Sequence, residues 1–150
     1  MIVDALLAYL HFTAILILAS ALGAEALLLR AQAGADTLRS LARADILYGI
    51  SSGVVIVTGL LRLFYGAKGH AFYVANPVFW LKMGLFVAVG LLSIPPTLKF
   101  IHWRRRLAAD AKYLPPINDV ASTRRLVFIE LHLLALIPLA AVFLARGLGI

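Results

Sequence analysis

The chain contains no cysteine and few charged residues, and both shortages narrow what it can be. Without cysteine it forms no disulfide, has no thiolate metal site and carries no haem attached through a C-x-x-C-H motif. Only 14% of its 150 residues are charged and 63% are hydrophobic, whereas a soluble domain is typically about 25% charged and about half apolar. A soluble globule could not cover that much apolar surface. We therefore expect a lipid bilayer to surround the protein.

Four long apolar stretches account for this composition. A bilayer core needs about 20 residues of helix, and only helices or closed barrels satisfy their backbone hydrogen bonds inside it. The sequence therefore predicts an all-α fold, an integral membrane four-helix up-and-down bundle that forms a single domain over residues 1–150. The expected helices span residues 2–29, 46–64, 77–101 and 124–146.

The residues between and within these stretches predict where the helices bend and begin. Gly34-Ala35-Asp36 is typical of a turn, and Ser122 or Thr123 is typical of a helix N-cap. Pro95-Pro96 should kink or locally break the third helix near its inner end, because proline removes a backbone donor and clashes with the preceding turn.

Two tryptophans predict how the third helix sits in the membrane. Trp80 and Trp103 would lie about 34 Å apart along a helix. Indole rings favour the boundary between lipid and water, so we expect one of them at each interface.

The positive charge is unevenly distributed, and its distribution predicts an orientation. Ten of the 14 Lys and Arg residues lie in the first and third connections, which share one side of the membrane. Basic loops stay cytoplasmic, so both termini should lie outside. We interpret these loops as anchors for anionic lipid headgroups and expect no nucleic-acid partner. The ten residues are Arg30, Arg39, Arg43, Lys99, Arg104, Arg105, Arg106, Lys112, Arg124 and Arg125.

Ionisable side chains also occur inside the apolar stretches. Each costs about 2.5–3.5 kcal/mol at the centre of a bilayer, so such residues should face the bundle interior. In the first helix, Asp4, His11 and Glu25 are separated by multiples of seven residues and therefore project from nearly one face. We expect this face to be buried against the other helices. The alternative to a functional role is that such polar faces bond to one another and only fix the helix register.

The depth of these residues predicts two polar layers. His11 lies about 13 Å and Lys82 about 7–8 Å from the outer surface at the rise of an α-helix, and Arg62 is close to that level. We therefore expect these three residues to meet in the outer half. Arg30 and the basic loops should neutralise the acids of the inner half. The inner layer comprises Glu25, Asp45, Glu130 and His132.

The histidines raise the possibility of a haem ligated from two sides. His132 would lie about 8 Å from the level of His11 along the bundle axis, so pairing of His11 with another outer group is the simpler arrangement. Glu130 and His132 are two residues apart and point to different faces, so they do not form a chelating pair.

Several motifs resemble those of a bacterial family of small four-helix membrane proteins of unknown function. The similarity spans essentially the whole chain, and it implies a bacterial cytoplasmic (inner) membrane but no activity. The motifs are Gly59-Leu-Leu-Arg-Leu-Phe-Tyr-Gly-Ala-Lys-Gly69, Phe72-Tyr-Val-Ala-Asn-Pro-Val-Phe-Trp-Leu-Lys82, Leu91-Leu-Ser-Ile-Pro-Pro-Thr97 and Glu130-Leu-His132.

Leu10-His11 and Trp80-Leu81-Lys82 are also similar to positions in HemJ-type protoporphyrinogen oxidases and CopD-like membrane proteins. This resemblance implies a site for haem b or a porphyrin, with His11 as the candidate iron ligand and Lys82 near a propionate. Arg62 and His132 complete the set of candidate cofactor-binding residues.

Three functions therefore remain open. The first is a redox protein that holds b-type haem, a porphyrin or another hydrophobic cofactor between its helices. The second is a non-catalytic subunit or assembly factor of a larger membrane complex, or a homo-oligomer. The third is a small proton-coupled carrier that uses Glu25, Asp45 and Glu130 as a relay.

Overall fold

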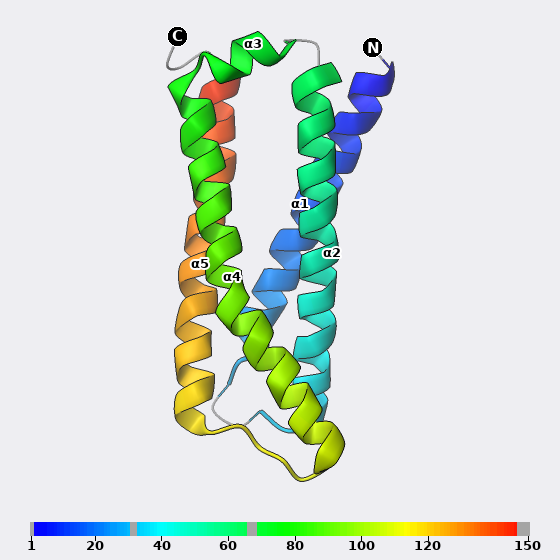
Figure 1. The fold of residues 1–150 in the computed structure, drawn as a ribbon, viewed down its shortest axis with the longest axis vertical. Helices are drawn as coiled ribbons and strands as arrows, with labels where there is room; N and C mark the ends of the chain where they lie inside the picture. Colours follow the sequence, from blue (N-terminus) through cyan, green and yellow to red (C-terminus); the bar gives the residue numbers. More distant parts are fainter. Residues whose placement is uncertain (1, 31–32, 66–68, 147–150) are drawn as a thin grey trace.

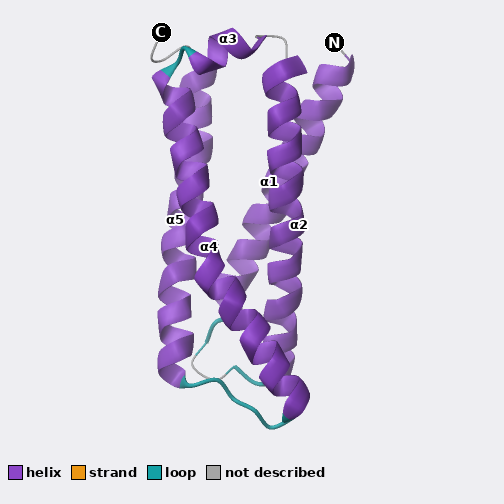
Figure 2. Cartoon of the chain, in the orientation of Figure 1, coloured by secondary structure: helices purple, strands orange, loops and turns teal. Residues whose placement is uncertain are grey.

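The computed structural model describes residues 2–30, 33–65 and 69–146, and its regular structure there is helical throughout (Figure 2). Four of the helices are long and apolar enough to cross a membrane, and α3 is a short additional helix. The predicted all-α membrane four-helix bundle is therefore confirmed. The helices are α1 (Ile2–Leu28), α2 (Ala35–Tyr65), α3 (Gly69–Val74), α4 (Pro77–Ala109) and α5 (Ile117–Ala145).

The long helices are arranged as two antiparallel pairs, α1 with α2 and α4 with α5, and contacts of α2 with α4 and of α1 with α5 join the pairs. The start of α1, the end of α5 and the short α3 lie together at one end of the bundle (Figure 1). We call this end the outer end. The opposite end, which carries the α1–α2 and α4–α5 connections and the ten clustered basic residues, is called the inner end.

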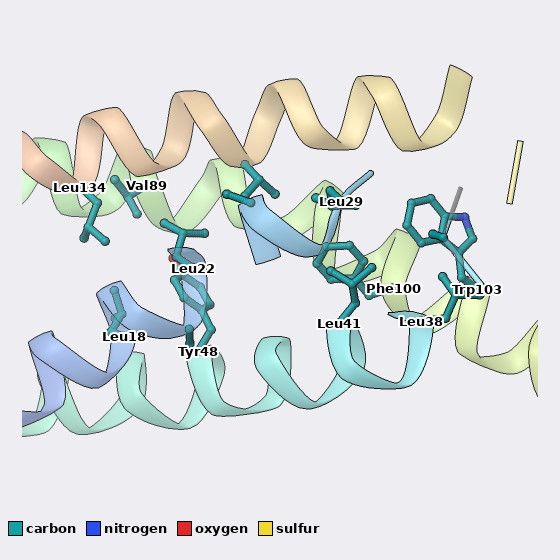
Figure 3. Packing of buried hydrophobic residues seen from close by; sticks show 14 of the residues in the cluster. Leu18, Leu22, Leu29, Leu38, Leu41, Tyr48, Val89, Phe100, Trp103 and Leu134 are labelled. Carbon is teal, nitrogen blue, oxygen red and sulfur yellow. The ribbon is translucent and has the colours of Figure 1, made fainter. Parts of the chain in front are cut away.

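The hydrophobic core fills the inner part of the bundle, where side chains from α1, α2, α4 and α5 point toward one another (Figure 3). Its outermost buried members on the four helices are Ala14, Val55, Val89 and Leu134. Among the described residues, the helix segments beyond these positions add no buried member to this cluster. The two helix pairs therefore share a continuous apolar core in the inner part of the bundle but not at its outer end.

The second long helix begins earlier than the sequence predicts. The expected turn at 34–36 is wrong, because α2 begins at Ala35 and the carbonyl of Gly34 accepts the N–H of Leu38 at 3.0 Å. Leu38 and Leu41 are buried in the core. The charged residues around them face away from the core, so this segment is an amphipathic extension of the helix.

The last helix also begins early, at Ile117 with Pro116 as its N-cap residue, so the predicted cap at Ser122 or Thr123 is wrong. The hydroxyl of Thr123 instead donates to the carbonyl of Asp119 at 2.7 Å, one turn back within the helix. A threonine bonded in this way satisfies its own hydroxyl and can lie inside a helix.

The third long helix runs without interruption through Pro95-Pro96 to Ala109, so a local break there is wrong. Figure 1 shows that α4 nevertheless bends, since its first half follows α5 and its second half turns toward α2. In a bilayer, unwinding would expose further backbone polar groups to hydrocarbon, whereas a bend leaves only the bonds that proline removes unmade.

The two tryptophans differ in their surroundings. Trp80 is 58% exposed, and its indole Nε1 donates to the carbonyl of Val74 at 3.0 Å, which ties the start of α4 to the end of α3. Trp103 is fully buried beside Phe100, with the ring centroids 5.8 Å apart. The expectation of an interfacial Trp103 is therefore wrong, because the bend of α4 and the extension of α2 enclose this ring in the core.

Candidate functional site

A histidine on α1 and a threonine on α2 form the first polar contact at the outer edge of the core. The Nδ1 atom of His11 lies 2.9 Å from the Oγ1 atom of Thr58. The single hydroxyl proton of Thr58 is directed to the carbonyl of Val54 at 2.6 Å. Thr58 must then accept a hydrogen bond from His11, so Nδ1 carries the proton and Nε2 has a free lone pair.

A glycine leaves room for this imidazole. A Cβ atom at Gly59 would lie 3.3 Å from Cε1 of His11, closer than ordinary van der Waals contact. The missing side chain at Gly59 therefore lets α2 approach the ring of His11, and Thr58 beside it supplies the hydrogen bond.

Two cationic side chains lie near the same level. The guanidinium carbon of Arg62 lies 5.2 Å from the ring centroid of Phe12, and Nζ of Lys82 lies 5.6 Å from that of Phe79. The contact with Phe12 places Arg62 beside the segment of α1 that carries His11, whereas Lys82 packs against Phe79 of its own helix. The meeting of all three residues stays a prediction.

His132 does not join this group. Its side chain is on the exposed side of α5, where Nδ1 lies 2.6 Å from the carbonyl oxygen of Phe128. Glu130, two residues earlier, is only 1% exposed. The prediction that these two residues face different sides is confirmed, and the structure does not bring His132 and His11 together inside the bundle.

The inner polar layer contains carboxyl groups from three helices. Glu25 of α1 is 2% exposed, Glu130 of α5 is similarly buried, and Asp45 of α2 is half-buried. The hydroxyl of Tyr48 donates to Oε1 of Glu130 at 2.5 Å, and that of Thr97 on α4 donates to Oδ1 of Asp45 at 2.6 Å. All four long helices therefore contribute to this layer, and the predicted burial of Glu25 is confirmed.

Tyr48 and Thr97 were not predicted to hold these carboxyl groups. Tyr48 is three residues after Asp45, a spacing that places both residues on one side of α2, so the sequence contains a signal for it. Thr97 follows Pro95-Pro96, and its approach to Asp45 depends on the bend of α4. The proline pair predicts a bend but not the direction in which α4 bends.

The basic residues do not neutralise the inner carboxyl groups, contrary to the prediction. Arg30 instead donates from Nε to the carbonyl of Leu27 at 3.1 Å. Over residues 2–30, 33–65 and 69–146, the ion pairs are Arg39 with Asp36 and Lys99 with Asp119. Glu25, Asp45 and Glu130 are therefore without an ion-pair partner in the described part of the chain.

A family described as "Predicted membrane protein (DUF2214)" matches residues 3–149. The chain belongs to this family. Membership agrees with the four membrane-spanning helices and with the resemblance to a small membrane family of unknown function. No curated protein and no solved structure matches the chain significantly.

Proposed function

We propose that the protein binds a hydrophobic redox cofactor, such as b-type haem, a porphyrin or a quinone, in the outer half of the bundle. The observation that carries the proposal is the fixed orientation of His11. Its Nδ1–H is bonded to Thr58, so Nε2 is available as a ligand at the level where the shared core ends. A ligating histidine typically donates its other ring N–H to a fixed acceptor in this way.

The charges around His11 fit a planar group that carries carboxylates. An iron ligand is needed on the face of a b-type haem, and cations are needed near its propionates. His11 would supply the iron ligand, and Arg62 and Lys82 on the outer segments of α2 and α4 would supply the cations. Such a group would supply one-electron chemistry when bound. The similarity to HemJ-type and CopD-like proteins rests on short motifs alone, so these contacts are the main support.

The same proposal includes a location and an orientation. The concentration of basic residues at the inner end favours a bacterial cytoplasmic membrane with that end in the cytoplasm. His11, Arg62 and Lys82 would then lie in the half of the bilayer away from the cytoplasm, and both termini would lie outside.

An absorption spectrum of the detergent-extracted protein, recorded oxidised and reduced after expression with ample haem, tests the proposal. We expect a Soret band that is lost or shifted in His11→Ala. The matched control is His102→Ala, which removes an exposed histidine of α4. A wild-type protein without a bound chromophore or quinone, or a spectrum that His11→Ala leaves unchanged, would refute the assignment of His11.

A role as a non-catalytic subunit of a larger membrane complex is the second candidate. It is favoured by a shallow groove of about 720 Å³ on the exposed side of α5, where Arg124, Arg125, Phe128 and His132 line it together with aliphatic side chains. Arg and aromatic residues are enriched in protein interfaces. Co-purification of a stable partner, lost in Arg124→Ala with Arg125→Ala, would support this function, and extraction as a single species would count against it.

A further inference from the structure

The inner polar layer joins the two helix pairs inside the membrane. Its two hydrogen bonds, from Tyr48 to Glu130 and from Thr97 to Asp45, both cross from one pair to the other. Glu25 of α1 is buried in the same inner part of the bundle, between the core residues Leu22 and Ala26. Three carboxyl groups from three helices therefore share one buried region.

Three ionised carboxylates would be electrostatically unfavourable in this region. At a separation of several ångströms, like charges repel strongly where water is scarce, and each ionised group also loses its hydration. No Lys or Arg among the described residues forms an ion pair with any of the three. The region therefore requires positive charge from outside the protein.

Glu25 provides an independent indication of a ligand. The residue is only 2% exposed. Its buried Oε1 atom nevertheless has no hydrogen-bond partner among the described residues. A buried oxygen without a partner costs about 1–3 kcal/mol. This oxygen lies in the same region as the other two carboxyl groups, so a small ligand that bonds to it would remove that cost.

The geometry distinguishes between a metal ion and a proton. In the described ranges, no three His, Cys, Asp or Glu side chains are arranged to hold a metal ion. A proton needs one oxygen atom and no coordination shell. We propose that Glu25, Asp45 and Glu130 form a proton-binding site in the inner half of the bundle, with Tyr48 and Thr97 as its fixed hydrogen-bond donors.

The two hydrogen-bond donors indicate which carboxyl group holds the proton. Tyr48 occupies Oε1 of Glu130 and Thr97 occupies Oδ1 of Asp45, so both oxygens already accept hydrogen bonds. Oε1 of Glu25 has no such donor. Glu25 is therefore the main proton carrier. Asp45 is the least buried of the three and exchanges protons with the inner aqueous side.

Besides Glu25, the titratable groups of this layer are Asp45 and Tyr48 on α2 and Glu130 on α5. α4 contributes the hydroxyl of Thr97, which donates to Asp45. On α4, the ion-pair partner of Lys99 is Asp119, 3.0 Å away.

Infrared spectroscopy of the purified protein in lipid tests the site directly, because a protonated carboxyl group has a carbonyl stretch that a carboxylate lacks. At neutral pH we expect a protonated-carboxyl band in the wild type that shifts in D₂O. Glu25→Gln should remove most of it and Glu130→Gln should change its position. Asp36→Asn, which alters a fully exposed carboxyl group on α2, should leave it unchanged.

Glutamine has the size and neutrality of protonated glutamic acid, so these variants should fold, and far-UV circular dichroism checks this. Absence of the band in the wild type, or a band that Glu25→Gln leaves intact, overturns the proposal. A band present in potassium buffer but abolished by sodium would assign the site to a metal cation instead and would also overturn it. Measurements in the His11→Ala background keep the result independent of cofactor binding.

Discussion

At the scale of single residues, Thr58 decides which nitrogen of His11 is free. A membrane histidine without a fixed partner exchanges its proton between two nitrogens, and each form presents a different atom. Because the Thr58 hydroxyl donates to the carbonyl of Val54, only its lone pairs remain for His11. Thr58 therefore fixes the protonated nitrogen of His11, and the proposed cofactor would bind the other nitrogen.

Replacing Thr58 by valine keeps the shape of the side chain and removes this acceptor. We expect the apparent melting temperature in detergent to fall, corresponding to about 1 kcal/mol, and haem affinity to fall about 10–100-fold. A haem titration and a melting curve measure the two effects. Thr58→Ser retains the hydroxyl and should remain close to the wild type, and equal losses in both variants would show that the methyl group and not the hydrogen bond matters.

A side chain at Gly59 should displace the imidazole. Gly59→Val places its Cβ 3.3 Å from Cε1 of His11, and overpacking of this kind costs about 1–3 kcal/mol. Gly49→Val is the matched control on the same helix, because a Cβ there meets no atom within 4 Å. Melting curves should separate the two variants clearly, and similar melting temperatures would contradict the close approach of α2 to His11.

At the scale of the helices, polar contacts and the apolar core join the two pairs at different depths. The core extends outward to the level of Ala14 and Leu134, and the inner carboxyl layer lies within it. Hydrogen bonds between membrane helices average about 0.6 kcal/mol, and reach about 1–2 kcal/mol in model peptides. The pairs are thus held at the inner end by packing and by a few such bonds.

Tyr48→Phe removes the hydroxyl that donates to Glu130 without changing the ring. Since Glu130 then loses its donor while buried, we expect a stability loss of about 1–3 kcal/mol in thermal unfolding. Tyr9→Phe changes a tyrosine that is 67% exposed and should have no measurable effect. A double-mutant cycle with Glu130→Gln should show coupling, and additive losses would mean that the two residues do not interact.

At the scale of the whole molecule, the chain runs along the bundle four times, once in each long helix. The start of α1 and the end of α5 therefore lie at the same end of the bundle (Figure 1). The bundle is apolar on its outside, and its basic residues gather at the opposite end. The positive-inside rule predicts that this end lies in the cytoplasm. Lys68, one of the four Lys and Arg residues that do not belong to the ten clustered ones, lies outside the described residues.

The absence of cysteine makes this orientation simple to measure, because one introduced cysteine is the only thiol. Ala71 on α3 and Ala109 at the end of α4 are both exposed and lie at opposite ends. In intact cells we expect an impermeant thiol reagent to label Ala71→Cys at once and Ala109→Cys only after permeabilisation. The reverse pattern would place the termini in the cytoplasm.

The sequence by itself determined the number of membrane helices and the burial of the Glu25 face, because hydrocarbon penalises unpaired backbone groups and charges so strongly. It also placed His11, Arg62 and Lys82 at a similar depth, because depth follows directly from the helical rise. Helix ends were less predictable. The first segments of α2 and α5 bury their apolar side chains only where another helix packs against them. This packing cannot be seen in the sequence of either segment.

Only the tertiary structure decided which polar groups meet. Depth along a helix does not specify the direction in which a side chain points, so His132 was grouped with the inner acids although it faces outward on α5. The pairing of Thr97 with Asp45 depends on the bend of α4, and the burial of Trp103 on the helices that surround it. Such contacts are set by the packing of helices that are distant in sequence, which no single helix encodes.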